Sequence, residues 1–164
     1  MTKNNIKHCL TLVLIIMLIL TSCGLETINR DKEYDRQLII HFLDVGQGDS
    51  TFIQFPNGET ALIDGGTRNS GEKVVKYLKE LNIYTVDYLI ATHPHEDHIG
   101  GLPEVIRNFK IGKVYMPNKT ANTLIFEELV EELKAKNLKI TIAKGGDVLI
   151  DEAGIKFLIL APNR

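Results

Sequence analysis

Four side chains that commonly bind metal ions lie close together in the segment Thr92–His98, spaced as His-x-His-x-Asp-His. They follow the apolar run Val86–Ala91, which predicts a buried strand. The next residues, Ile99-Gly100-Gly101-Leu102-Pro103, predict the start of a helix. We therefore expect the potential ligands on a loop between a strand and a helix, where α/β proteins often carry functional residues.

The spacing of these side chains predicts two groups of ligands. Alternate side chains of an extended backbone point the same way, so His93 and His95 can reach one metal ion. The chain turns after Glu96, and Asp97 and His98 can then face a second ion. Imidazole and carboxylate groups suit zinc, and also iron or manganese. A catalytic site of this kind keeps one position for water and lowers its pKa to about 7. The alternative, ordinary surface or core histidines, fits such a cluster poorly.

Three motifs together resemble a known family. THPHEDHIGG (92–101) resembles the first metal motif of the metallo-β-lactamase superfamily, and FLDVGQGDS (42–50) and LIDGG (62–66) precede it. In this order the motifs resemble the hydrolase domain at the C-terminus of the competence protein ComEC and in its stand-alone relatives. The resemblance runs from about residue 38 to the end of the chain. It implies an α/β fold, the metallo-β-lactamase αββα sandwich, of which this chain supplies roughly the N-terminal half, a mixed sheet with flanking helices.

The resemblance also implies an activity. Members of this type are metal-dependent hydrolases, and it implies two divalent ions, zinc or manganese, acting on phosphodiesters, DNA among them. Asp97 would orient or deprotonate the attacking water as well as bind metal. Asp64 would accept a hydrogen bond from a ligand histidine and fix its tautomer. The alternative for Asp64 is a turn-initiating residue at the end of a strand.

Further ligands are expected at later positions in the family: a third His, a bridging Asp and another His. Outside the motif this sequence contains only His8 and His41, and we expect neither to be a ligand. Three explanations are open: a longer chain, an interrupted gene, or a second polypeptide that completes the sandwich.

The segment that contains His41 is apolar at nearly every position from Leu38 to Leu43, which predicts a strand buried on both faces. A glycine-rich turn follows it. Asp44, Gln47 and Asp49 in that turn have two readings, polar groups near the site or local turn hydrogen bonds. Further on, Asn69-Ser70 predicts the cap of a helix that closes near Asn82.

The N-terminus predicts secretion. Residues 1–22 combine Lys3 and Lys7 with the apolar run 10–20, which is shorter than a comfortable membrane span of ~20 apolar residues. Leu20-Thr21-Ser22-Cys23 resembles the lipobox of bacterial lipoproteins, which implies cleavage before Cys23 and attachment of lipid to it. The alternative is an uncleaved anchor. We expect a tether over 23–36, the hydrolase-like domain over 37–164, and an extracytoplasmic, membrane-anchored lipoprotein.

Charge and cysteine content limit the possible binding partners and metal ligands of the domain. The first 22 residues contain two basic and no acidic residues, so the rest of the chain carries 17 basic and 21 acidic residues. This balance shows no basic excess of the kind that marks a nucleic-acid partner. Cys9 and Cys23 are the only cysteines, so a disulfide framework and a thiolate ligand in the domain are both excluded.

The leading hypothesis is thus a membrane-anchored metallo-hydrolase of the ComEC-like type. A non-enzymatic surface lipoprotein that binds metal weakly or not at all is the alternative from another class. A β-lactam-hydrolysing enzyme is a third option, against which Gln47-Gly48-Asp49 argues by resemblance.

Overall fold

The computed structural model describes residues 37–152 and 154–162. The expected signal segment (1–22), Cys23 and the tether (23–36) lie outside the described residues. Among the residues that are described, no helix combines the length and the apolar character needed to cross a membrane.

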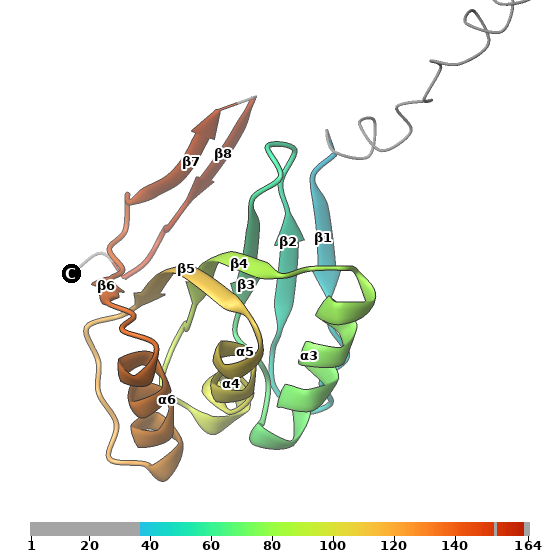
Figure 1. Cartoon of the computed structure of the whole chain (residues 1–164). Helices are drawn as coiled ribbons and strands as arrows, with labels where there is room; N and C mark the ends of the chain where they lie inside the picture. The colour runs from blue at the N-terminus through green and yellow to red at the C-terminus, as the bar shows by residue number, and fades with distance from the viewer. Residues whose placement is uncertain (1–36, 153, 163–164) are drawn as a thin grey trace, which may run out of the picture. The chain divides into compact units, whose positions relative to one another are not determined.

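A six-stranded mixed sheet is the centre of the domain (Figure 1). Its strands lie in chain order: β1 (Ile39–Phe42), β2 (Thr51–Gln54), β3 (Thr60–Ile63), β4 (Thr85–Ile90), β5 (Lys110–Met116) and β6 (Ile140–Ile142). The first three strands are antiparallel, while β3 to β6 are parallel to one another. The mixed α/β architecture with flanking helices is confirmed.

The hairpin of β2 and β3 turns at Pro56-Asn57-Gly58. Gly58 adopts a φ of 86°, and its N–H donates to the carbonyl of Phe55 at 2.9 Å. Glycine is favoured at this position because a left-handed backbone costs it little.

One face of the sheet is covered by helices: η1 (Arg68–Ser70), α3 (Gly71–Glu80), α4 (Glu96–Ile99), α5 (Leu102–Asn108) and α6 (Leu124–Ala135) (Figure 1). Their apolar residues recur at helical spacing and are buried against the sheet. Ile125, Leu129 and Leu133 of α6 are at most 6% exposed. Together with Phe52, Leu62 and Leu89 from the sheet, these side chains form the main core.

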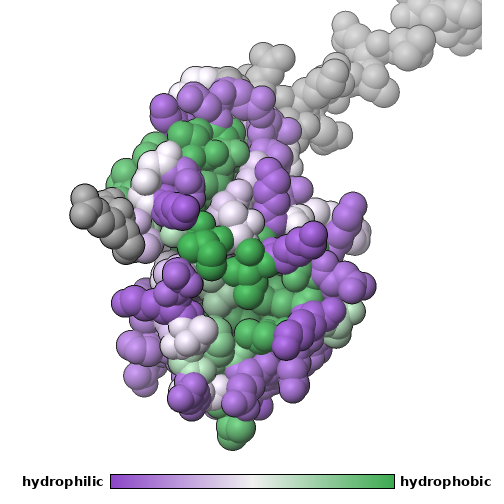
Figure 2. Space-filling model, turned by 90° about the vertical axis from the view of Figure 1, so that its left-hand side faces the viewer, coloured by the Kyte–Doolittle hydropathy of each residue, from purple (hydrophilic) through white to green (hydrophobic). Residues whose placement is uncertain are grey.

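The opposite face of the sheet is covered only in part. The hairpin of β7 (Val148–Glu152) and β8 (Ile155–Leu158) packs on it through Ile150 and Phe157, and these contact Phe55 and Tyr88. Burial there raises the pKa of Tyr88 to about 12, helped by the nearby Glu59 carboxylate. Figure 2 shows apolar surface on the side where β6 and the hairpin lie; the apolar residues exposed on these elements include Ile140, Ile142 and Val148.

Burial of β1 on both faces is a wrong prediction. β1 is an edge strand whose residues alternate between half-buried and exposed, and Ile40 and Phe42 are 47% and 82% exposed. His41 points toward the helices, where Tyr77 donates to its Nδ1 and its Nε2–H donates to Gln54. The nearly continuous apolar run indicated two buried faces, but only one face of β1 packs against other elements. His41 thus lies within a strand, as the apolar run predicts, and the expectation that it is not a ligand stays a prediction.

The predicted cap of α3 also differs. Ser70 precedes the helix but makes no side-chain cap; its hydroxyl donates to the carbonyl of Val45 at 2.8 Å instead. The side chain thereby ties α3 to the glycine-rich turn, a long-range contact that capping preferences do not reveal.

The parallel strands bring three loops to one edge of the sheet. Asp64 follows β3, the segment 92–98 follows β4, and residues 117–123 follow β5. The carboxyl ends of neighbouring parallel strands meet at the same edge, where ligands bind in open α/β sheets.

Candidate metal centre

Three glycine-rich segments meet at the carboxyl edge through backbone hydrogen bonds. We call residues 92–98 the metal loop. The N–H of Asp49 donates to the Asp97 carbonyl at 3.2 Å, and the N–H of Gly65 donates to the His98 carbonyl at 2.8 Å. Gly66 in turn donates to Asp49 at 2.9 Å. The three motifs found in the sequence are therefore one hydrogen-bonded unit around the metal loop.

Gly48 shows how closely these segments approach. A Cβ at this position would lie 1.9 Å from the Asp97 carbonyl oxygen, and the residue has a φ of 102°. Only glycine fits both the contact and the backbone conformation. The close contact of Gly48 with the Asp97 carbonyl thus helps to fix the position of the metal loop relative to the glycine-rich turn.

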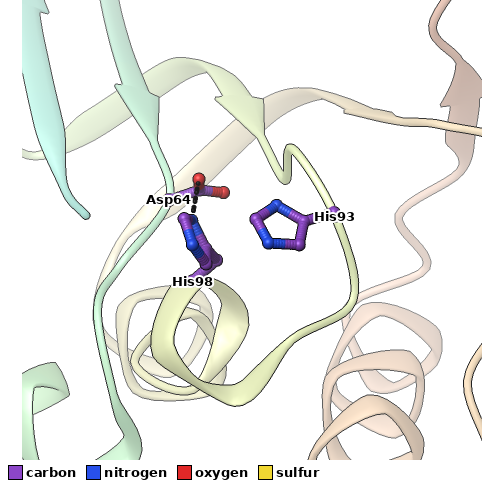
Figure 3. A group of neighbouring side chains, drawn as sticks. All are labelled: Asp64, His93 and His98. Atoms are coloured by element: carbon purple, nitrogen blue, oxygen red, sulfur yellow. Dashed lines mark hydrogen bonds and ion pairs between the residues drawn. The ribbon is translucent and has the colours of Figure 1, made fainter. Parts of the chain in front are cut away.

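The three histidines of the metal loop converge. The His93 ring centroid lies 4.6 Å from that of His95 and 3.8 Å from that of His98. His93 lies in the bend between β4 and α4, whereas His98 comes from α4, the short helix that begins after His95. The helical turn, which sequence spacing indicated only as a change of direction, brings His98 back beside His93 (Figure 3).

Asp64 lies next to His98 and is 2% exposed. Its carboxylate accepts hydrogen bonds from His98 Nδ1 at 2.9 Å, drawn dashed in Figure 3, and from the Thr92 backbone N–H at 2.8 Å. It also accepts a bond from the Thr92 hydroxyl. Three donors balance this buried carboxylate, as a charge inside a protein requires.

Thr92 extends the same network to His93. The hydroxyl proton of Thr92 goes to Asp64, so Thr92 Oγ1 accepts from His93 Nδ1 at 3.0 Å. Both imidazoles then carry their proton on Nδ1, and Nε2 of each is left with a lone pair that can bind a metal ion. The sequence analysis did not predict this role of Thr92. The only sequence signal for it is that Thr92 directly precedes His93.

Asp97 lies near His98 in the metal loop. His98 Nε2 is 3.9 Å from Asp97 Oδ2, a separation that an ion between them could bridge. Asp49 Oδ2 lies 3.8 Å from His98 Nδ1, whereas Asp44 accepts from the Gly46 N–H at 3.2 Å in its own turn. Each of the two readings of the polar turn residues therefore applies to one residue: Asp49 lies near the site, and Asp44 makes a local hydrogen bond in the turn. That hydrogen bond and the nearby Lys73 ammonium lower the pKa of Asp44.

Electrostatics favour neutral imidazole at His93. Burial lowers its pKa below the usual 6.5, and the neighbouring His98 and His95 rings lower it further. Neutral imidazole is the form that binds metal. The lowered pKa therefore keeps His93 available as a ligand near neutral pH.

The donor set fits a divalent cation. One potential ligand atom each from Asp64, His93 and His98 lie within 4.8 Å of one another. Because the Asp64 oxygens already accept three hydrogen bonds, Asp64 suits a supporting role better than direct coordination. Of the four predicted ligands, His93, His95 and His98 have neighbouring rings, and Asp97 Oδ2 lies 3.9 Å from His98 Nε2. Among the described residues, the group of ligand atoms within 4.8 Å contains His93 and His98 but neither His95 nor Asp97. The assignment of the four residues as ligands stays a prediction.

Comparison with known proteins agrees with this geometry. The model of the family described as "Metallo-beta-lactamase superfamily" matches residues 43–161. The chain belongs to the metallo-β-lactamase superfamily. It is 28% identical over 141 residues to ComE operon protein 3 of Bacillus subtilis (strain 168), a match that covers 76% of this chain and 18% of that protein. The ComEC-like resemblance of the motifs is thereby confirmed.

Two further relatives carry ribonuclease names. Ribonuclease J of Mycoplasma pneumoniae is 34% identical over 122 residues, covering 73% of this chain and 19% of the relative. Endoribonuclease ysh1 of Schizosaccharomyces pombe is 30% identical over 101 residues, covering 56% and 13% respectively. The chain thus spans less than a fifth of the length of these curated relatives.

Proposed function

We propose that this chain is a metal-dependent hydrolase that cleaves phosphodiester bonds, with nucleic acid as its substrate class. The convergence of three imidazoles and Asp97 above a buried Asp64–Thr92 network carries the proposal. Similarity to proteins named ribonuclease and endoribonuclease supports the substrate class.

Each side chain has a distinct part in this proposal. His93 and His95 would hold a first divalent ion, zinc or manganese, and Asp97 and His98 would hold a second. An ion in such a site lowers the pKa of bound water and stabilises charge on a phosphoryl oxygen. Asp97 orients the attacking water and accepts its proton, while Asp64 and Thr92 hold the His98 and His93 rings in the tautomer that leaves Nε2 free.

We also propose that the domain works outside the cytoplasm, anchored by lipid on Cys23. The basic start, apolar run and lipobox-like residues of the sequence support this. A second polypeptide that covers the open part of the sheet is a further proposal, supported by the half-exposed Leu38 and Ile40. Replacement of Cys23 by Ser should abolish labelling of the protein with radioactive palmitate, and unchanged labelling would contradict lipid attachment at Cys23.

The test of the activity is hydrolysis of bis(p-nitrophenyl) phosphate and of a single-stranded oligonucleotide by the full chain with added Zn²⁺ or Mn²⁺. We expect metal-dependent turnover that His93→Ala abolishes. His41→Ala is the matched control, because it removes an imidazole that lies outside the site. Absence of metal-dependent turnover, or equal turnover in His93→Ala, would contradict the proposal and favour a non-enzymatic surface lipoprotein.

A further inference from the structure

An apolar groove opens directly beside the metal loop. Its walls are Pro94 and His95 on one side and Leu124 and Ile125, at the start of α6, on the other. Its volume is about 610 Å³, and binding pockets usually measure roughly 300–1,000 Å³. A group held at the metal loop therefore has an apolar compartment within reach.

Leu124 is the unusual residue of this groove. It is 80% exposed, whereas Ile125, Leu129 and Leu133 on the same helix are buried. Its position is fixed, because the side chain of the preceding Thr123 accepts from the Phe126 N–H and caps α6. A leucine held in this way beside His95 contributes nothing to the core and offers an apolar surface to a ligand.

The charged residues of the groove are already engaged. Glu96 accepts from the Arg68 backbone N–H at 2.9 Å, and the Arg68 guanidinium forms an ion pair with Glu128. The groove therefore suits a flat, neutral group better than a second phosphate.

We propose that this groove binds a nucleobase next to the scissile phosphate, with Leu124 and Pro94 contacting the face of the base. This inference rests on the proposed function for the substrate class. It is carried by the continuity of the groove with the metal loop, since His95 belongs to both. A base has an apolar face and is neutral, and contact with its face is sequence-tolerant. Leu124 is thus a specificity-determining residue that favours nucleotides over simple phosphodiesters.

The test measures binding, so that it does not depend on turnover. Two fluorescein-labelled hexanucleotides with hydrolysis-resistant phosphorothioate linkages, one of thymidine and one of abasic residues, are titrated with the full chain in Zn²⁺ and followed by anisotropy. We expect the thymidine probe to bind more tightly. Leu124→Ser should weaken it about 10-fold and leave the abasic probe unchanged, whereas Leu124→Met should bind like wild type.

Leu160→Ser is the matched control, because Leu160 is 77% exposed and lies after β8, outside the groove. The proposal is overturned if Leu124→Ser binds thymidine like wild type, if it weakens both probes equally, or if wild type does not prefer thymidine. Failure of the proposed function is seen separately, as absent turnover of both hydrolysis substrates. Turnover of the hydrolysis substrates without an effect of Leu124→Ser on binding would overturn only the proposal that the groove binds a nucleobase.

Discussion

Two clusters of titratable side chains differ in how their charges are balanced. The metal-loop cluster, which comprises Asp64, His93, His95, Asp97 and His98, packs three imidazoles together. The arginine cluster joins Arg107 of α5 to Glu104, Glu128 and Glu132 at 3.0, 2.7 and 2.8 Å. These glutamates raise the pKa of Arg107, and each of the three carboxylates is paired with its guanidinium.

The difference separates a structural cluster from a functional one. The arginine cluster is complete within the chain and ties α5 to α6. In the metal-loop cluster like groups face one another, and Nε2 of His93 and of His98 make no hydrogen bond within the described part of the chain. Two Nε2 lone pairs without a donor, close to the Asp97 carboxylate, form a donor set that a divalent cation can fill, so the metal-loop cluster is the one that indicates chemistry.

The largest contrast is expected in hydrolysis. Asp97→Asn removes the carboxylate that accepts the water proton and should lower turnover roughly 10²- to 10⁴-fold. Asp151→Asn, at an exposed ion pair on β7, should leave the rate unchanged. The rate of bis(p-nitrophenyl) phosphate hydrolysis checks both variants, and similar rates in both would break the distinction between a catalytic and a structural carboxylate.

A glycine pair tests the packing that supports the metal-loop cluster. Gly48→Ala would place Cβ 1.9 Å from the Asp97 carbonyl oxygen, whereas Gly46→Ala meets nothing within 4 Å; both residues have positive φ. We expect Gly48→Ala to lower the free energy of unfolding by about 2 kcal/mol more than Gly46→Ala. Urea denaturation measures the difference. Equal losses would mean that the turn does not support the loop.

The hydrogen-bond relay predicts a smaller effect on metal affinity. Thr92→Val keeps the size of the side chain but removes the hydroxyl that joins His93 to Asp64. Zinc affinity should fall about 10-fold, as is typical when a partner of a ligand histidine is lost. Competition with a chelating dye measures it, and Thr141→Val on the exposed edge strand β6 is the control. An unchanged affinity would show that His93 needs no support.

The arginine cluster should respond in stability alone. Arg107→Ala removes three ion pairs from a partly exposed site and should lower the free energy of unfolding by about 1 kcal/mol without changing zinc affinity. Urea denaturation and the same dye competition make the comparison. A loss of zinc affinity in this variant would contradict the separation between a structural arginine cluster and a metal-binding cluster.

Much of this arrangement follows from local sequence. The strands, the apolar faces of α5 and α6, and the convergence of the metal-loop histidines all have short-range signals, namely hydrophobic period and ligand spacing. The contacts that complete the site are long-range: Asp64 to Thr92, Ser70 to Val45 and Asp49 to Asp97. Sequence spacing cannot provide them because they depend on how the strands are paired. The exposed side of β1 was missed for the same reason.

Zinc binding by the metal-loop cluster is the central claim. Equilibrium dialysis of the full chain against Zn²⁺, followed by metal analysis of the protein, tests it most directly. Wild type and His41→Ala should retain stoichiometric zinc, and His93→Ala should lose most of it. A wild-type chain that holds no zinc, or a His93→Ala variant that holds as much as wild type, would contradict the account.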